Sequence, residues 1–318
     1  MRALVVGATG LLGRHVVLEL RRRGSEAIAS SRSLGLDLRD QAAVRDAVAA
    51  WQPEAIINCA CLGGSVHFVM GHAADVIDAN TRMTLNIYDA AVRLKVRPLI
   101  VNPLANCSYS EAGELQVEDQ WLDGPVHGSV TSFGNATRMK YFLAKCYAEQ
   151  HGMRSINLLA GGLFGPLDHL EDHKLHAIDG LILRIVRAKL ANEPSLKIWG
   201  TGTPVRECFF VKDFARLLVD VLSMDLDLLY PINVSQNFAL SVNEIAQTAK
   251  RIVGYEGTLE HDLSYRDGAS VKAVDNRRFR SLFPKFVFTD FEEAVRQTAD
   301  YYLHAVEDQP ATPVSARP

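Results

Sequence analysis

Three glycines lie close to the beginning of the chain, within the segment Gly-Ala-Thr-Gly-Leu-Leu-Gly at residues 7–13. In a dinucleotide-binding loop the first glycine permits a tight turn, the second lets the backbone approach a pyrophosphate, and the third lets a helix pack closely on a strand. An apolar run precedes Gly7 and an amphipathic helical pattern follows Gly10, so the helix N-terminus would face the anion. The alternative is a tight turn without a ligand. We favour cofactor binding, with contacts from Gly7, Thr9, Gly10, Leu11, Leu12 and Gly13.

An arginine flanked by serines, in the sequence Ser30-Ser31-Arg32-Ser33, follows the second predicted strand. A site that selects NAD usually offers a carboxylate to the ribose 2′-hydroxyl at this point. A guanidinium beside hydroxyl groups suits a 2′-phosphate instead, and no acidic residue competes for the position. Arg32 therefore favours NADP(H) over NAD(H), although a solvated surface arginine would give the same sequence.

Histidines at spacings of four and three residues share the segment 168–176 with three acidic residues, which on one helix would bring metal ligands to a single face. Pro166 and the acidic run favour an exposed loop instead, and we predict no metal site there. The residues concerned are Asp168, His169, Glu171, Asp172, His173 and His176.

The five cysteines lack the paired spacings of a disulfide framework or a zinc knuckle, so we expect reduced thiols. Cys59 and Cys61 lie two residues apart at a predicted strand end and would point to the same side. We interpret them as small buried residues rather than as metal ligands.

The elements that must position these groups alternate between strand and helix over the first half of the chain. Such alternation predicts an α/β fold with a doubly wound parallel sheet, a Rossmann domain over residues 1–160. The predicted strands are 3–6, 27–30, 55–59, 99–103 and 155–159, and the predicted helices are 11–23, 41–51, 75–94 and 135–150.

The second half is less regular. Residues 161–306 are expected to form mainly a smaller substrate-binding lobe, with some return to the Rossmann sheet, and 180–190 reads as a helix. The tail 307–318 has too few apolar groups to order itself and is expected to be frayed.

The formal charge of −3 and the interspersed charges provide no basic face for nucleic acid. No apolar run reaches the roughly 20 residues that span a bilayer, and the first strand begins almost at Met1, leaving no room for a signal peptide. We therefore expect a cytoplasmic protein without nucleic-acid or membrane partners.

Most of the chain resembles the GDP-fucose synthases, members of the extended short-chain dehydrogenase family that act as epimerase-reductases on a nucleotide-linked 4-keto sugar with NADPH. The resemblance is carried by segments 7–13, 36–40, 58–64, 102–109, 163–166, 200–207 and 267–272. It implies that Asp37 and Leu38 flank the adenine and that Asn58 and Ala60 belong to the cofactor site. It also implies that Arg206 and Lys272 border the sugar-diphosphate part of the substrate.

The chain departs from this family at the three positions that assist hydride transfer. The family pattern places a Ser or Thr where Ala105 stands, a Tyr where Phe133 stands and a Lys where Thr137 stands. A tyrosine with a nearby lysine normally supplies the proton for the developing alkoxide, and a hydroxyl binds the carbonyl oxygen. Ordinary reduction should be severely impaired, unless Tyr141 with Lys145 replaces the missing pair.

Two other functional positions match, because Cys107 and His176 stand where the family has its active-site cysteine and histidine. The resemblance implies that they form an acid-base pair that inverts a carbon beside a ketone. From the residues alone, a small buried cysteine and a hydrogen-bonded loop histidine are the favoured interpretation, and only their joint match at the family spacing makes a chemical role equally acceptable.

The leading hypothesis is an NADP(H)-binding epimerase or isomerase of nucleotide-linked or similarly activated sugars, with Cys107 and His176 transferring protons. The first alternative is a catalytically silent NADP(H)-binding regulatory or partner subunit. The second is a keto-sugar reductase that uses Tyr141, Ser108 or water as a non-standard acid. Homodimers through the helices at 75–94 and 135–150 are expected by analogy with the family.

Overall fold

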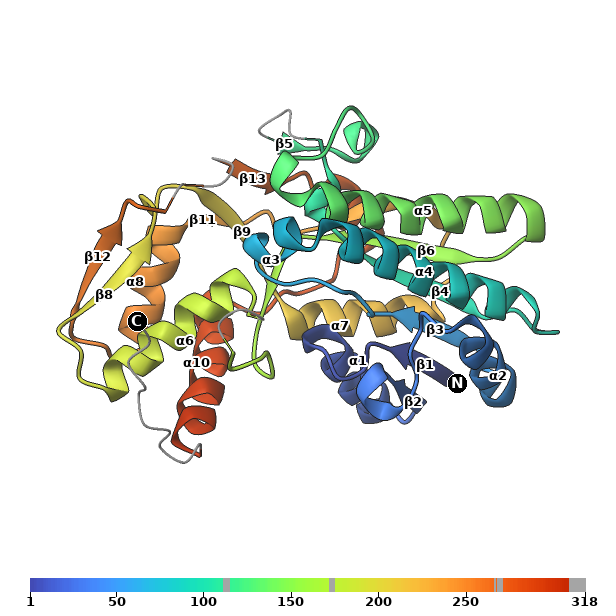
Figure 1. The fold of residues 1–318 in the computed structure, drawn as a ribbon, viewed down its shortest axis with the longest axis horizontal. Helices are drawn as coiled ribbons and strands as arrows, with labels where there is room; N and C mark the ends of the chain where they lie inside the picture. The colour runs from blue at the N-terminus through green and yellow to red at the C-terminus, as the bar shows by residue number, and fades with distance from the viewer. Residues whose placement is uncertain (111–114, 172–174, 266, 268–270, 309–318) are drawn as a thin grey trace.

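A parallel six-stranded sheet forms the centre of the larger part of the molecule (Figure 1). The computed structural model describes residues 1–110, 115–171, 175–265, 267 and 271–308. The strand order is β10-β6-β4-β3-β1-β2, which confirms the doubly wound α/β fold. The strands are β1 (Arg2–Val6), β2 (Glu26–Ser30), β3 (Ala55–Asn58), β4 (Leu99–Ala105), β6 (Ser155–Ala160) and β10 (Leu228–Val234).

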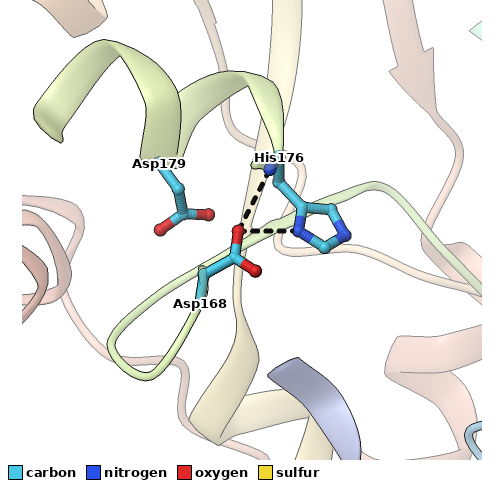
Figure 2. A group of neighbouring side chains, drawn as sticks. All are labelled: Asp168, His176 and Asp179. Carbon is cyan, nitrogen blue, oxygen red and sulfur yellow. Dashed lines mark hydrogen bonds and ion pairs between the residues drawn. The ribbon is translucent and has the colours of Figure 1, made fainter. Parts of the chain in front are cut away.

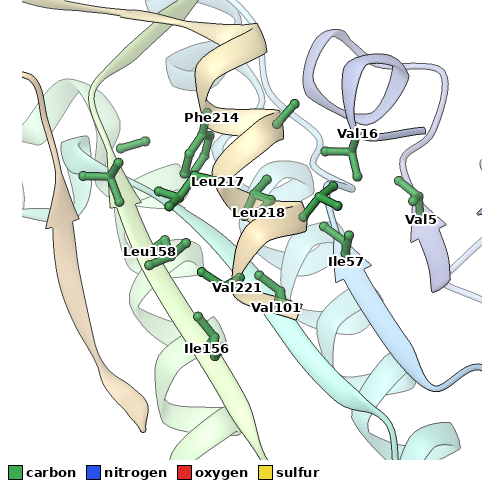
Figure 3. Close-up of a cluster of buried hydrophobic side chains, with 14 of the residues drawn as sticks. Val5, Val16, Ile57, Val101, Ile156, Leu158, Phe214, Leu217, Leu218 and Val221 are labelled. Carbon is green, nitrogen blue, oxygen red and sulfur yellow. The ribbon is translucent and has the colours of Figure 1, made fainter. Parts of the chain in front are cut away.

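Helices cover both faces of this sheet, which explains why the inner strands are apolar along almost their whole length. On one face α1 (Leu11–Arg22) and α7 (Val211–Asp220) pack together, and Figure 3 shows Val16, Leu217 and neighbouring side chains meeting the sheet. On the other face lie α2 (Gln41–Trp51), α4 (Ala73–Val92) and α5 (Thr131–His151).

A second hydrophobic core lies in the smaller lobe, among α6 (Ala177–Leu190), α8 (Val242–Val253) and α10 (Phe291–Glu307). Its strands form mixed and two-stranded sheets. They are β5 (Leu115–Gln116), β7 (Gly162–Phe164), β8 (Ser195–Trp199), β9 (Val205–Phe210), β11 (Ala239–Ser241), β12 (Thr258–Asp262) and β13 (Val271–Val274).

Every helix and strand expected in the first 160 residues is present, with ends that differ by a few residues. The chain also contains the short helices α3 (Val66–Gly71) and α9 (Arg277–Leu282), which periodicity did not predict. Short 3-10 turns are η1 (Arg32–Leu34), η2 (Asn106–Ser108), η3 (Glu118–Gln120), η4 (Gly128–Val130) and η5 (Val221–Ser223).

Strand β10 comes from the second half of the chain but forms an edge of the large sheet, beside β6. The predicted frayed tail at 307–318 lies outside the described residues from 309 onward. Among the helices of the described part, none combines the length and the apolar character needed to cross a bilayer.

Candidate functional site

The glycine loop follows β1 and leads directly into α1. Gly7 has φ +73°, in the left-handed region, and a Cβ there would lie 2.6 Å from the backbone N of Ala60. A Cβ on Gly13 would overlap the carbonyl oxygen of Gly7. Gly10 stands at the N-cap of α1 in extended conformation, and its N–H donates to the Gly7 carbonyl at 3.1 Å. Side chains at Gly7 and Gly13 would separate the loop from β3 and α1, so the sequence requires glycine there.

Hydroxyl groups connect the glycine loop to the end of β2. Thr9 Oγ1 lies 3.2 Å from Ser33 Oγ, which in turn lies 3.0 Å from Ser31 Oγ. Arg32 begins η1 next to them and is exposed to solvent. The structure therefore places the guanidinium-bearing residue and three hydroxyl groups at the carboxyl edge of the sheet, where an open α/β sheet binds its ligands.

Asp37, the residue expected beside the adenine, is neutralised by its neighbour. Arg39 donates to both carboxylate oxygens of Asp37, with distances from 2.5 to 3.1 Å, and this hydrogen bonding lowers the Asp37 pKa to about 2. Leu38 is buried, and its carbonyl accepts a hydrogen bond from Asn86 Nδ2 at 2.9 Å. The backbone of this segment is thereby held against α4.

The residues at this edge fit a dinucleotide. Gly7 and Gly13 form a cradle that a Cβ would fill, and α1 presents the unpaired N–H groups of its first turn beside it. Two buried oxygens, Ser30 Oγ and Asn58 Oδ1, have no hydrogen-bond partner among the described residues. They stand at the carboxyl ends of β2 and β3, on either side of β1.

The three positions at which the resemblance predicts hydride-transfer groups offer no free proton donor. Ala105 is the last residue of β4, and the Phe133 ring in α5 packs against the loop after β3, where a Cβ on Gly63 would lie 3.2 Å from its Cε2. The hydroxyl of Thr137 donates to the Phe133 carbonyl at 3.0 Å, within the helix. None of these side chains can protonate an alkoxide.

Ser108 and Tyr141, which the sequence analysis considered as alternative proton donors, are buried in the core. Ser108 Oγ donates to the Ala105 carbonyl at 2.6 Å and accepts from Trp121 Nε1 at 2.8 Å, so both of its hydrogen-bonding roles are used. The Tyr141 ring is buried between the rings of Trp121 and Tyr230, at centroid distances of 5.4 and 5.6 Å. Helix α5 therefore turns Tyr141 inward, into the core and not toward solvent.

Lys145, the proposed partner of Tyr141, is exposed and lies 3.8 Å from Glu149 one turn further along the helix. The Lys145 ammonium pairs with a surface carboxylate, whereas the Tyr141 ring is buried among aromatic side chains. The Tyr141–Lys145 pair is consequently not arranged as a catalytic pair.

Cys107 lies in η2, immediately beyond β4, and is half-buried. Its carbonyl oxygen would be 3.0 Å from a Cβ on Gly134, so the backbone approaches the first turn of α5 closely. Strands β4 and β6 are parallel neighbours, with Ala105 beside Ala160. The segment after β4 that carries Cys107 therefore begins at the same sheet edge as the segment after β6 that leads to His176.

His176 is held by a buried carboxylate, as Figure 2 shows. Its Nδ1 donates to Asp168 Oδ2 at 2.9 Å, and its backbone N donates to the same oxygen at 3.0 Å. Burial lowers the pKa of His176, but the hydrogen bond and charge of Asp168 outweigh burial and raise it above the usual value. Because Nδ1 is occupied, Nε2 is the nitrogen left for chemistry, on a side chain that is about half exposed.

A second carboxyl group, that of Asp179 in the first turn of α6, lies beside Asp168, on the side away from the His176 ring (Figure 2). It accepts from the Gly165 backbone N at 3.0 Å, and burial followed by the nearby Asp168 charge raises its pKa well above the usual range. The expected exposed loop is exposed only in part: His169 is exposed, but Asp168 is only 3 % exposed.

The ligand-type atoms of Asp168, His176 and Asp179 all lie within 4.8 Å of one another, so this group could hold a cation. The His176–Asp168 hydrogen bond already uses the ring nitrogen that faces the carboxylates, which favours an acid-base group instead. His169 is exposed, and Asp172 and His173 lie outside the described residues, so the histidine cluster considered from sequence is not tested.

Arg206 on β9 is paired in backbone register with Lys272 on β13. Burial lowers the Arg206 pKa, and the charge of Asp267 opposes this. Asp267 also accepts hydrogen bonds from the backbone N and hydroxyl of Thr201, at 3.0 and 2.6 Å. The two expected substrate-binding residues thus stand at one level of neighbouring strands.

Lys140, which the sequence analysis did not identify, is buried in the middle of α5. Its Nζ donates to the carbonyl of Ala60 at 3.5 Å, in the segment that packs on the glycine loop. The available signal was its position seven residues after Phe133, two helical turns along one face.

The chain is similar in sequence to one protein family and to several individual proteins. The model of the NAD dependent epimerase/dehydratase family matches residues 3–229. A probable GDP-L-fucose synthase of Oryza sativa is 28% identical over 309 residues, which are 96% of this chain and 93% of that protein. The GDP-L-fucose synthase of Escherichia coli is 27% identical over 290 residues, covering 88% and 90% of the two chains.

The crystal structure of a GDP-L-fucose synthetase from Naegleria fowleri bound to NADP superposes with a TM-score of 0.88. The sequence identity to that structure is 25%, and the match covers 96% of this chain and 93% of the other.

Proposed function

The chain belongs to the NAD dependent epimerase/dehydratase family, and on that premise we propose that it binds NADP(H) and a nucleotide-linked sugar and transfers protons beside a ketone. Cys107 and His176 form the acid-base pair. The observation that carries the proposal is the Asp168–His176 pair, which orients an imidazole at a sheet edge where the expected hydride-transfer donors are absent.

Inverting a carbon beside a ketone needs a base on one face of that carbon and an acid on the other. Asp168 holds the Nδ1–H tautomer of neutral His176, so that Nε2 can accept a proton, and the carboxylate then stabilises the imidazolium that forms. The Cys107 thiol provides the second group. Either residue can begin the exchange: neutral His176 or the Cys107 thiolate accepts the first proton, and the other group, in its protonated form, returns one to the opposite face.

NADP(H) is the proposed cofactor because the glycine cradle accepts a dinucleotide and Arg32 suits a 2′-phosphate. The solved Naegleria relative contains NADP. The cofactor supplies a hydride when a family member carries out reduction. In this chain the side chains of Ala105, Phe133 and Thr137 supply no proton to accompany that hydride. The proposed rate of proton exchange is therefore higher than the rate of ketone reduction.

The proposed substrate is a nucleoside-diphosphate-linked sugar, since the relatives are GDP-L-fucose synthases. Arg206 and Lys272, in register on neighbouring strands, supply two cationic residue types for the diphosphate. The smaller lobe would provide most of the remaining contacts.

The test uses a GDP-linked 4-keto-6-deoxy sugar in deuterated water, with deuterium followed by NMR at the carbons that flank the ketone. We expect uptake with the unsubstituted protein and its loss in the Cys107→Ala and His176→Asn variants. Cys146→Ala is the matched control, because Cys146 is an exposed cysteine on α5. Absence of uptake, or equal uptake in all variants, would sink the proposal.

A catalytically silent NADP(H)-binding subunit is the second candidate. The observation that favours it is the internal use of the Ser108 and Thr137 hydroxyls, which removes two substitutes for the missing donors. Its signature is tight NADP(H) binding, no deuterium uptake and a stoichiometric partner, whereas turnover of a keto sugar would exclude it.

Homodimerisation through α4 and α5 is part of the proposal. Four apolar side chains on these two packed helices are 39–42% exposed, namely Ile77, Leu85, Met139 and Phe142. Burying them against a second copy would remove them from water. We expect twice the chain mass in sedimentation and a shift toward monomer in Phe142→Glu; a monomeric unsubstituted protein contradicts the proposal.

A further inference from the structure

Lys140 is the only lysine or arginine classed as buried in the described part of the chain, with 7 % of its surface exposed. It occupies the inward face of α5, the same face as Thr137. Lysine keeps its ammonium in water wherever its flexible side chain allows. A buried lysine in the middle of a long helix therefore requires an explanation in its surroundings.

The ammonium has little compensation from the protein. Among the described residues its one hydrogen-bond acceptor is the Ala60 carbonyl, at a long 3.5 Å, and no carboxylate pairs with it. Its ionisable neighbours are the thiols of Cys59, which is half-buried, and Cys61, which is exposed and not buried as the sequence analysis expected. Desolvation raises the pKa of both thiols, to about 12 for Cys59. Burial also lowers the Lys140 pKa. A cation with spare donors and no anion is poised for a ligand that brings oxygens.

The segment that Lys140 contacts, residues 59–60, packs directly against the glycine loop. A Cβ on Gly7 would lie 2.6 Å from Ala60 N and 2.7 Å from the Cys59 carbonyl carbon. The loop that would cradle a pyrophosphate and the carbonyl that accepts from Lys140 thus belong to one contact. Lys140 belongs to α5, which covers the face of the large sheet opposite α1 and α7 (Figure 1).

Helix geometry brings the ammonium toward the site. Lys140 lies seven residues beyond Phe133, about 10 Å along the axis, but a helical side chain points back toward the helix N-terminus. A lysine extended in that direction recovers roughly 6 Å of this displacement. Its ammonium therefore lies at about the same height along the helix axis as the Cα atom of Thr137.

We propose that Lys140 replaces the lysine that the family resemblance places at Thr137, and that its ammonium binds ribose or pyrophosphate oxygens of the dinucleotide. The residue makes a cofactor contact from one turn further along α5. This inference rests on the cofactor-binding part of the proposed function and is independent of proton transfer by Cys107 and His176.

The test measures the dissociation constant of NADPH by its fluorescence, without turnover. Lys140→Met removes the ammonium and keeps the buried stem, and we expect affinity to fall roughly 10- to 100-fold, the range for a charge-assisted hydrogen bond. Lys145→Met is the matched control on the same helix, because Lys145 is exposed and pairs with Glu149. It should bind NADPH as the unsubstituted protein does.

A relocated lysine separates a cofactor contact from a merely structural role. In Lys140→Met/Thr137→Lys the ammonium returns to the position of the family pattern. The logarithm of the NADPH dissociation constant should then recover at least half of the change caused by Lys140→Met. Adenosine 2′,5′-bisphosphate, which lacks the second ribose, distinguishes the bound oxygens. Loss with both ligands locates the contact near the adenosine phosphate, and loss with NADPH alone locates it further along the dinucleotide.

Three results would overturn the inference: an unchanged dissociation constant in Lys140→Met, an equal loss in Lys145→Met, or no recovery in the relocated variant while its thermal midpoint is normal. If the unsubstituted protein binds neither ligand, cofactor binding itself fails. Deuterium uptake can still proceed or fail separately, so the two proposals are distinguishable.

Discussion

Replacing Asp168 with asparagine removes the negative charge that holds the His176 ring and leaves the size of the side chain almost unchanged. Asp168 Oδ2 accepts both the ring N–H and the backbone N–H of His176, and its carboxylate is fully buried. Burial alone lowers the His176 pKa, and Asp168 reverses that effect. The variant keeps burial and loses the opposing charge, so the His176 pKa must fall.

The size of the change follows from the contacts. A hydrogen bond to a charged group contributes about 1.5–3 kcal/mol, and solvent screening of a half-exposed imidazole reduces this to about 1–1.5 kcal/mol. Since 1.36 kcal/mol corresponds to one pKa unit, we expect a fall of roughly one unit. The pH at which proton exchange by His176 is half-maximal should move down with it.

The pH dependence of stability has a defined sign. The raised His176 pKa stabilises the folded state below the unfolded value of 6.5, and this contribution is lost as pH rises through the folded pKa. Burial raises the Asp168 pKa, but its bonds with His176 outweigh this and lower it, so its contribution is present above 3.8 and is lost as pH falls through the folded value. The thermal midpoints of the unsubstituted protein and of Asp168→Asn should differ most between about pH 4 and 6.5, where both contributions are present.

The assay is histidine-ring NMR, which reports the His176 pKa directly. Asp300→Asn is the control, because the Asp300 backbone carbonyl, not its carboxylate, accepts from the ring of His304 at 2.7 Å. The His176 pKa should be unchanged in that control. A His176 pKa in Asp168→Asn that equals or exceeds the unsubstituted value would refute the reasoning.

Three further substitutions test the placement of the site. Gly13→Ala places a Cβ against the Gly7 carbonyl, so NADPH affinity should fall at least tenfold and the thermal midpoint should drop, by fluorescence titration and calorimetry. Ser108→Ala leaves the buried Trp121 Nε1–H without its acceptor, so urea unfolding should show a loss of about 1–3 kcal/mol. Tyr141→Phe keeps the packed ring, so deuterium uptake should be unchanged and the free energy of unfolding should change by less than about 1 kcal/mol.

Each of these expectations has a clear contrary result. Unchanged NADPH binding in Gly13→Ala would mean that the glycine loop does not cradle the cofactor. Unchanged stability in Ser108→Ala would show that its hydroxyl is not part of the core. Loss of deuterium uptake in Tyr141→Phe would restore that hydroxyl as a catalytic acid.

The helices and strands of the Rossmann part could be predicted because their signals are local. Apolar runs followed by helical periodicity predict alternation, and alternation leaves few topologies other than a parallel sheet. The glycine loop belongs to the same class of signal, because the conformation of Gly7 and the close approach of Gly13 are requirements of the backbone. The family resemblance then supplied positions such as Cys107 and His176.

The environment of each side chain could not be predicted in this way. Periodicity placed Tyr141 on a helix, but the side of the helix that faces the core depends on Trp121 and Tyr230, 20 and 89 residues away in the sequence. Asp168 looked exposed beside other acids, and only the return of the chain into α6 brings His176 against it.

The sequence by itself determined the glycine cradle, the parallel sheet and the absence of the expected donors at Ala105, Phe133 and Thr137, since these depend on residue identity and short-range spacing. The tertiary structure alone decided that Asp168 holds His176 and that the Ser108 hydroxyl bonds to the Ala105 carbonyl. It also decided that the nearly unpaired ammonium of Lys140 lies against the segment that packs on the glycine loop. The physical reason is that burial, charge and hydrogen bonding arise between segments that meet only when the chain folds.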